Sequence, residues 1–144
     1  MGLTRYIRPF FDRRKVAIDR YADAAEEIQR RVLSNLVRTA EDTAFGHRNT
    51  FDDIDSYDDF ARQVRVNTYE DLKDDIDKMR HGERDVLWPG KVKWYAKSSG
   101  TTNDKSKFIP VTKAGLHDTH YAGGRDAVVL YLIILRATSS RGGD

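Results

Sequence analysis

The first half of the chain carries a helical pattern of apolar positions. Between about Arg14 and Thr39, apolar residues recur every three or four positions, with charged residues between them. They are Ile18, Ala22, Ala25, Ile28, Val32 and Leu36. Tyr21 and Leu33 widen this stripe, and Gly46 follows shortly afterwards as a stop signal. The pattern predicts a helix that packs on a domain core.

Two shorter helices, over residues 57–64 and 69–81, are predicted from cap signals. Ser56 and Thr68 stand where N-cap hydroxyls are expected, and an aspartate follows each of them three residues later. Gly82 is typical of the residue just past a helix C-terminus. The apolar face of the second helix consists of Tyr69, Leu72, Ile76 and Met79. These helices look like a scaffold without chemistry of their own.

The pattern changes to that of strands after the turn at residues 88–90. Residues 92–97 and 107–111 each favour a strand, and Pro110 places the second one at a sheet edge or near its end. Thr112 then caps a helix predicted to run from Lys113 to about Arg136.

That last helix is predicted to be interrupted near Gly123 and Gly124.

The connection between the two predicted strands is about twice as long as an ordinary hairpin loop. It begins with Ser98-Ser99-Gly100-Thr101-Thr102, and lysines follow at 105 and 107. Glycine permits close backbone approach, hydroxyls and amides can donate to an anion, and lysines add positive charge. These are the requirements of a phosphate site, although neither GxxxxGK[ST] nor GxGxxG is present. The alternative is a solvated loop that only reverses the chain.

The amino-acid composition excludes several classes of protein function. The chain has 144 residues, of which 39% are hydrophobic and 33% charged, and its net charge is only +2. This balance argues against a protein devoted to nucleic acid or to acidic membranes. The absence of cysteine excludes disulfides, thiolate nucleophiles and cysteine-ligated zinc. No apolar run approaches the roughly 20 residues that span a bilayer, and the start lacks a secretory signal, so a cytoplasmic protein is expected.

Two further groups of residues invite a functional interpretation. His117 and His120 could share a helix face, but two imidazoles without further ligands are a weak metal site. Trp94, Tyr95 and Phe108, interleaved with lysines, could stack on nucleic-acid bases. Strand alternation instead predicts that at least half of these rings belong to the core.

The sequence KSSGTTNDKSKFIPV, residues 97–111, closely resembles the phosphate-binding motif of the auxin-responsive Gretchen Hagen family of acyl-acid amido synthetases, nearest to its bacterial branch. That family belongs to the adenylate-forming superfamily, with acyl-CoA synthetases and luciferases. Residues 43–90 and 112–132 are similar to the flanking segments, so the resemblance covers roughly two thirds of the chain. It implies an α/β fold: a helical lead-in, then the first β-hairpin and helix of an adenylate-forming N-terminal domain.

The resemblance also implies a division of the chain. Residues 1–138 would form the N-terminal part of the adenylate-forming domain, and residues 139–144 a disordered tail. Within the larger part, the expected segments are helical (1–87), hairpin with phosphate loop (88–111) and helical again (112–138).

The implied chemistry has two steps. ATP and a carboxylic acid form an acyl-adenylate and pyrophosphate, and the amine of an amino acid then attacks to form an amide. The residues that would hold the ATP phosphates are Ser98, Ser99, Gly100, Thr101, Thr102 and Lys105. Lys107 is a weaker candidate because strand alternation aims it elsewhere. The ligands of Mg²⁺ are expected outside this chain. Thr43, in the helical lead-in, is expected to tolerate loss of its hydroxyl.

The sequence departs from the family pattern in two respects. Asn103 and Asp104 stand where the superfamily often has a glycine. The adenine and ribose motifs and the mobile C-terminal domain are missing from these 144 residues, so the chain alone is expected to be inactive. Its apolar strand faces would lack partners, which predicts self-association. The alternative function is a non-catalytic helical interaction or regulatory module that retains a phosphate loop.

Overall fold

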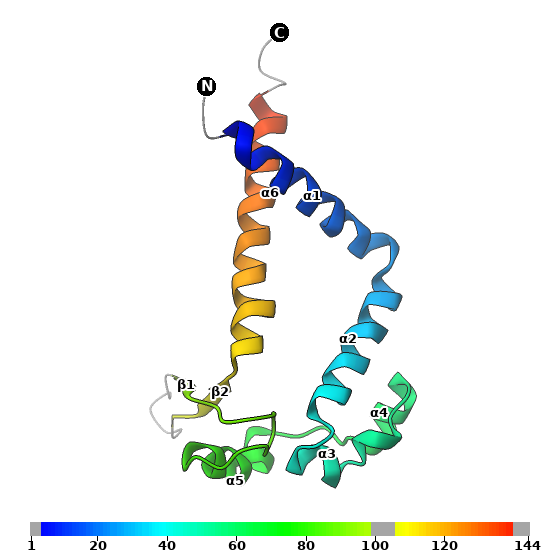
Figure 1. Cartoon of the computed structure of the whole chain (residues 1–144), viewed down its shortest axis with the longest axis vertical. Helices are drawn as coiled ribbons and strands as arrows, with labels where there is room; N and C mark the ends of the chain where they lie inside the picture. Colours follow the sequence, from blue (N-terminus) through cyan, green and yellow to red (C-terminus); the bar gives the residue numbers. More distant parts are fainter. Residues whose placement is uncertain (1–3, 99–105, 140–144) are drawn as a thin grey trace. The chain divides into compact units, whose positions relative to one another are not determined.

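The computed structural model describes residues 4–98 and 106–139, with the backbone alone at 4–10 and 136–139. Helices predominate, and the strands form one antiparallel hairpin, which confirms the predicted fold class. The elements, labelled in Figure 1, are α1 (Thr4–Asp23), α2 (Ala25–Ala40), α3 (Ala44–Arg48), the 3-10 turn η1 (Phe51–Asp53), α4 (Tyr57–Gln63), α5 (Tyr69–Arg80), β1 (Trp94–Lys97), β2 (Phe108–Val111), the π-helix η2 (Gly115–Tyr121) and α6 (Ala122–Ser139).

The chain divides into two compact units, one made of residues 1–28 with 114–144 and the other of residues 29–113. In the first unit, α1 contacts α6. Arg14 on α1 donates to both carboxylate oxygens of Asp126 on α6, each at 2.6 Å. This hydrogen-bonded pair holds the pKa of Asp126 below its ordinary value, with Arg14 as the main cause. Val129, one turn further along α6, is fully buried.

The helix predicted over 14–39 begins earlier than expected, at Thr4, and is divided at Ala24. Hydrogen bonds from Ala24 N to Arg20 O and from Ile28 N to Ala24 O, both 3.0 Å, continue the helical ladder across the division. Sequence periodicity cannot show such a division, because it leaves the spacing of apolar residues unchanged.

The interruption of the last helix lies at the π-helix η2 and not at the two glycines. Gly123 and Gly124 are part of α6, and a Cβ added to either would meet nothing within 4 Å. Exposed glycines lower helix propensity but do not break a helix by themselves. At its other end, α6 extends to Ser139, one residue into the predicted tail. Residues 140–144 lie outside the described part of the chain.

The second unit has two hydrophobic clusters. In the first, Val37, Ala40 and Phe51 are buried, and the half-buried side chains packed on them are Leu33, Phe45, Ile54, Phe60, Val64 and Trp88. In the second cluster, the buried residues are Met79, Val86 and Val92, and Leu87 and Tyr95 pack against them. The C-terminal part of the predicted helix reaches this core through Leu33, Val37 and Ala40. Val32 and Leu36, which the predicted stripe directed to the core, are instead 48% and 49% exposed.

The short helix α3 overturns two sequence-based expectations. Thr43 is fully buried, and its hydroxyl accepts from Gly46 N at 3.0 Å while donating to Ala40 O at 2.7 Å. It is therefore the N-cap of α3 and cannot be a neutral position. Gly46 lies inside α3 and does not stop the preceding helix, which ends at Ala40. The α3 amides of Ala44 and Phe45 donate to the carbonyls of residues 85 and 86.

The predicted caps of α4 and α5 are confirmed. Ser56 Oγ accepts from Asp59 N at 3.2 Å. Thr68 and Asp71 form a full capping box, in which each side chain bonds the other residue's backbone amide. At the other end of α5, Gly82 has a φ of +97°, the left-handed conformation expected just past a helix.

The capping box should make the start of α5 sensitive to acid. Hydrogen bonds from Thr68, with Arg65 nearby, hold the pKa of Asp71 below its ordinary value of 3.8. Because the folded pKa is depressed, the stabilisation is present above pH 3.8 and is lost as the pH falls through the folded value. In an NMR titration of the carboxyl carbon, we expect Thr68→Ala to raise the pKa of Asp71. An unchanged titration would contradict this explanation.

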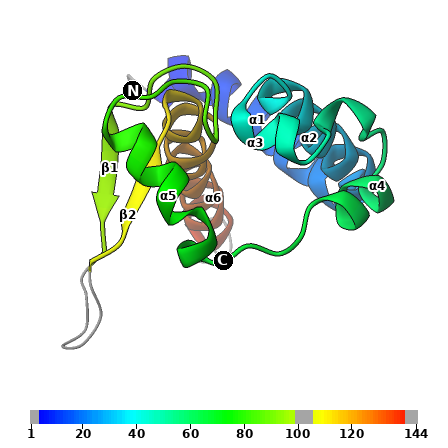
Figure 2. The same ribbon diagram turned by 90° about the horizontal axis from the view of Figure 1, so that it is seen from below.

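The hairpin pairs Trp94 with Val111, Tyr95 with Pro110, Ala96 with Ile109 and Lys97 with Phe108. The strands are shorter than predicted, beginning at Trp94 and Phe108. Figure 2 shows α5 lying against the hairpin, and α5 contacts β2 directly. This places the connection predicted to bind phosphate at the end of a hairpin that a helix supports.

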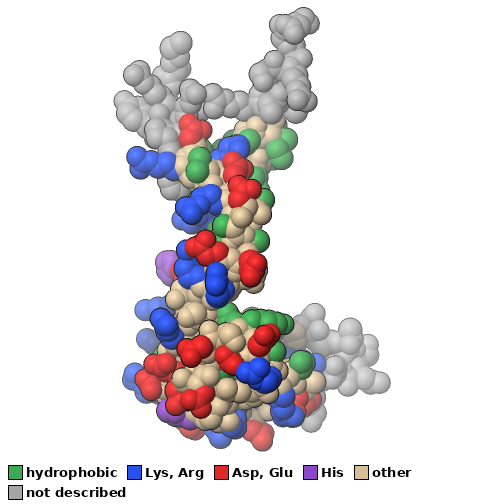
Figure 3. Space-filling view, turned by 90° about the vertical axis from the view of Figure 1, so that its right-hand side faces the viewer, with side chains coloured by type: hydrophobic (Ala, Val, Ile, Leu, Met, Phe, Trp, Pro, Cys, Tyr) green, Lys and Arg blue, Asp and Glu red, His purple; other side chains and the backbone are tan. Residues whose placement is uncertain are grey.

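On the face seen in Figure 3, acidic and basic side chains are interspersed without a continuous region of one sign. Among the described residues, no helix combines the length and apolar character needed to cross a bilayer.

Candidate functional site: the base of the predicted phosphate loop

The structure describes only one end of the predicted phosphate site. Ser98 and Lys107 lie in the described part of the chain. The other predicted phosphate residues, Ser99, Gly100, Thr101, Thr102 and Lys105, lie outside it. Their roles therefore stay predictions, and the geometry reported below is that of the loop's base.

Ser98 and Lys107 close the base of the loop through two hydrogen bonds. Ser98 N donates to Lys107 O at 3.0 Å, and Lys107 N donates to Ser98 Oγ, also at 3.0 Å. The serine side chain thus takes the place that its own carbonyl would have in a regular ladder. Because Ser98 Oγ is an acceptor in this bond, its own O–H remains able to donate to another group. The first hydroxyl of the motif is therefore held in a fixed position.

Helix α5 holds the second strand of the hairpin in place. Phe108 N donates to the hydroxyl of Tyr69, the first residue of α5, at 3.1 Å. At the other end of α5, the guanidinium of Arg80 lies 3.8 Å from the centroid of the Phe108 ring. The ammonium of Lys107 lies 5.4 Å from the Tyr69 ring centroid. Both ends of one helix therefore fix the strand that follows the loop.

Sequence reasoning did not find the supporting roles of Tyr69 and Arg80. Tyr69 was assigned only to the apolar face of its helix, and Phe108 lies 39 residues further along the chain. No local pattern signals a hydrogen bond between residues so far apart. The adjacent capping box is the nearest available sign, because it fixes where the first turn of α5 begins.

Removing the Tyr69 hydroxyl should loosen the hairpin without unfolding the unit. We expect Tyr69→Phe to cost about 1 kcal/mol, since it leaves the Phe108 amide without its partner. Amide hydrogen exchange should show faster exchange at Phe108 while Ala96 and Ile109 keep their protection. Tyr57→Phe is the matched control, because Tyr57 is 71% exposed. Equal exchange at Phe108 in both variants would show that the bond does not hold the strand.

The three aromatic rings near the loop do not form one stacking platform. Tyr95 packs on the buried cluster around Met79, and Phe108 contacts Arg80, so both face α5. Strand alternation puts Trp94 on the opposite face, where it is 49% exposed. Burial raises the pKa of the Tyr95 hydroxyl, whose oxygen has no hydrogen-bond partner in the described part of the chain. The arrangement favours a core role for two of the three rings.

The other sequence-based candidate, His117 with His120, does not extend to a metal site. The rings of both histidines lie edge-on to Tyr121, at 5.7 and 5.6 Å between centroids. Within residues 4–98 and 106–139, no three His, Cys, Asp or Glu side chains gather in a way that could hold a metal ion.

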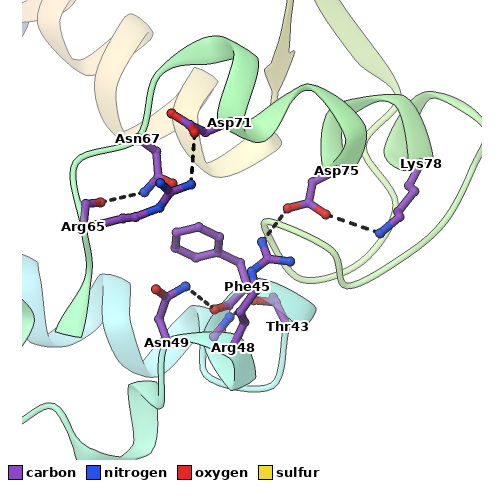
Figure 4. Close-up of polar contacts among 10 residues, drawn as sticks. Thr43, Phe45, Arg48, Asn49, Arg65, Asn67, Asp71, Asp75 and Lys78 are labelled. Carbon is purple, nitrogen blue, oxygen red and sulfur yellow. Dashed lines mark hydrogen bonds and ion pairs between the residues drawn. The ribbon is translucent and has the colours of Figure 1, made fainter.

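A second feature of residues 29–113 is a polar cleft of about 410 Å³, which no pattern in the sequence predicted. Figure 4 shows Asp75 of α5 between Arg48 of α3 and Lys78, at 2.5 and 3.5 Å. Arg65 pairs with Asp71 at 3.0 Å across the same cleft. The Asp75 side chain is 7% exposed, so its two cations supply the compensation that a buried carboxylate needs. The Arg48–Asp75 pair ties α3 to α5, whereas the pairs of Lys78 and Arg65 are local to α5 and the segment before it. These pairs favour a structural role for the cleft.

Comparison with known proteins agrees with the resemblance seen in the sequence. A model of the GH3 family N-terminal domain matches residues 14–138. Over 93 residues the chain is 27% identical to indole-3-acetic acid-amido synthetase GH3.6 of Arabidopsis thaliana, covering 64% of this chain and 15% of that protein. It is 28% identical over 93 residues to the probable synthetase GH3.1 of the same plant, covering 64% and 16%.

The matches to these relatives thus span only 15% and 16% of their length. The family match itself covers most of this chain, from the helical lead-in through the hairpin to α6. The chain therefore belongs to the GH3 family, and residues 14–138 correspond to its N-terminal domain.

Proposed function

We propose that this chain is the N-terminal portion of an ATP-dependent acyl-acid amido synthetase, in which residues 98–105 hold the phosphates of ATP. The observation that carries the proposal is the closure of the loop by Ser98 and Lys107 on a hairpin anchored to α5. Family membership and the printed names of the relatives, which are indole-3-acetic acid-amido synthetases, support the same function.

The described residues fit the phosphate end of a nucleotide. The Ser98 hydroxyl can donate, and Lys97 beside it is cationic, whereas the ammonium of Lys107 lies over the Tyr69 ring. Backbone amides and the hydroxyls of Thr101 and Thr102 would add donors, and Lys105 would add charge. Positioning and charge neutralisation are the main contributions that a protein makes to such transfers. The ligands of Mg²⁺ are proposed to lie in the rest of the synthetase.

In the proposed reaction the substrate carboxylate attacks the α-phosphorus of ATP, and the bond to pyrophosphate breaks. An amino acid amine then attacks the acyl carbon, and AMP leaves as the amide forms. The loop's part is to restrain the departing phosphates in line with the attacking oxygen. The proposed reaction needs no general base from this chain, and the 144-residue chain alone is proposed to be inactive.

The test is a fusion in which residues 14–138 replace the matched segment of indole-3-acetic acid-amido synthetase GH3.6. ATP–pyrophosphate exchange driven by indole-3-acetic acid, the acid in that relative's name, reports the first step. We expect Thr101→Ala to slow exchange by about a hundredfold, as for loss of one donor aimed at developing charge. Thr39→Ala is the control, because Thr39 is exposed on α2 and bonds only Asn35 O in its own helix. A folded fusion without exchange, or equal rates in both variants, would contradict the proposal.

A further inference from the structure

Tyr69 contacts two consecutive residues after the loop through different parts of its side chain. Its hydroxyl accepts from Phe108 N at 3.1 Å, and its ring centroid lies 5.4 Å from the ammonium of Lys107. The first contact holds the backbone of β2. The second contact holds a charged group that belongs to the base of the predicted loop, so its effect can be separate from that of the first.

The Lys107 side chain extends from the same face of the hairpin as that of Ser98. The two residues exchange hydrogen bonds, so they lie directly opposite each other. Opposite residues of an antiparallel pair project to one face. The Phe108 ring, one residue further on, contacts Arg80 of α5 on the other face. An anion that accepts from the Ser98 hydroxyl would therefore lie where the Lys107 side chain begins.

The ammonium of Lys107 can hold the ring and an anion at the same time. Among the residues that the structure describes, it forms no ion pair with a carboxylate. An ammonium has three donors, so one side can face the Tyr69 ring while another donates to an oxygen. A lysine side chain loses much rotamer freedom when it becomes fixed. Holding the ammonium beforehand lowers this cost when a ligand binds.

We propose that Tyr69 is a positioning residue of the phosphate site and that it acts through Lys107. Its ring holds the ammonium at the base of the loop, from where the ammonium donates to a phosphate oxygen of ATP. The inference rests on the proposed function and adds Lys107 to the residues that hold the phosphates. Strand alternation, which made Lys107 a weaker candidate, tells where a side chain leaves the strand but not where its flexible stem ends.

Two substitutions separate the ring from the hydroxyl. Tyr69→Phe keeps the ring beside Lys107 and removes the bond to Phe108, whereas Tyr69→Leu removes both contacts. In the GH3.6 fusion, we expect Tyr69→Leu to raise the KM for ATP in pyrophosphate exchange about fivefold, and Tyr69→Phe only about twofold. The maximal rate should change little, because the contact serves binding. Equal KM values in the two variants would overturn the proposal.

The same comparison without the lysine tests whether Tyr69 acts through it. Lys107→Met keeps a long aliphatic side chain and removes the charge. In this background, Tyr69→Leu and Tyr69→Phe should give the same KM for ATP, because no ammonium is left to hold. A difference that persists in the Lys107→Met background would show that the ring acts on the strand itself, and would overturn the proposal.

NMR of the 144-residue chain observes the contact without catalysis. Protons above an aromatic ring shift upfield, so the ε-methylene of Lys107 should be shifted in the parent and in Tyr69→Phe, and unshifted in Tyr69→Leu. Protection of the Ala96 and Ile109 amides shows that the hairpin is intact in each variant. An unshifted methylene in the parent would overturn the proposal. A shifted methylene with a fusion that lacks exchange would instead contradict the proposed function, and the proposal with it.

Discussion

Replacing Gly46 with alanine is expected to destabilise residues 29–113 by about 3 kcal/mol or more. A Cβ at this position would lie 2.2 Å from Ala40 O and 2.4 Å from Glu41 O, well inside contact distance. Both atoms belong to the backbone, so no side chain can rotate away. Ala40 O also accepts from the Thr43 amide and hydroxyl, which would be lost if that carbonyl moved. One methyl group therefore disturbs both the end of α2 and the cap of α3.

The measurement is urea unfolding followed by tryptophan fluorescence, because both tryptophans lie in residues 29–113. Gly124→Ala is the matched control, since a Cβ there meets nothing within 4 Å and alanine is the better helix former. We expect the Gly46 variant to unfold at much lower urea and the Gly124 variant to keep the parental midpoint. Equal midpoints would mean that the close approach of α3 to the end of α2 is not maintained in solution.

The second large effect concerns the loop. In the fusion with the GH3.6 synthetase, Gly100→Val is expected to reduce ATP–pyrophosphate exchange by more than the about hundredfold loss of a single donor. The reason is that a β-branched side chain blocks close approach of backbone amides to a phosphate and resists a positive φ. A melting curve accompanies each activity measurement. The Gly100 variant should melt with the parent, because the loop base depends on Ser98 and Lys107.

Two outcomes would contradict this prediction in different ways. Full activity of Gly100→Val would end the phosphate-loop hypothesis. A loss of exchange that only follows a lowered melting temperature would show that the glycine serves the fold and not the phosphates. The Thr39→Ala variant again provides the reference for a hydroxyl removed elsewhere.

The features that sequence predicted well are those whose causes are local. Ser56 and Thr68 cap helices because their hydroxyls reach amides three residues away, and the spacing alone reveals this. The hairpin was also predicted from local features, which are the strand-like residues of its two segments and the small residues that follow Lys97. The family resemblance, which was carried by residues 97–111 and by the segments on either side of them, is confirmed by the family match.

The features that sequence missed depend on residues brought together from a distance. Gly46 was interpreted as a helix stop. Glycine is instead required at this position because a Cβ would clash with the carbonyl oxygens of residues 40 and 41. Thr43 was expected to be neutral because its burial cannot be read from its neighbours. Asp75 lies within a run of acidic residues typical of a solvated face, yet it is a buried partner of Arg48, 27 positions away. Each of these roles requires knowing which segments meet.

The bond between Tyr69 and Phe108 also bears on the order in which the second unit assembles. The caps of α4 and α5 and the pairing of β1 with β2 involve residues that are close together in the sequence. These local structures can therefore form within microseconds. The Tyr69–Phe108 contact joins residues 39 positions apart. The chain must lose the entropy of closing this loop before the contact can contribute any stabilisation. We therefore expect α5 to form before the hairpin docks on it. We therefore expect the hairpin, with the loop predicted to bind phosphate, to open before the local caps of this unit. The contacts from Ala44 and Phe45 to residues 85 and 86, which also join distant segments, should open in the same way.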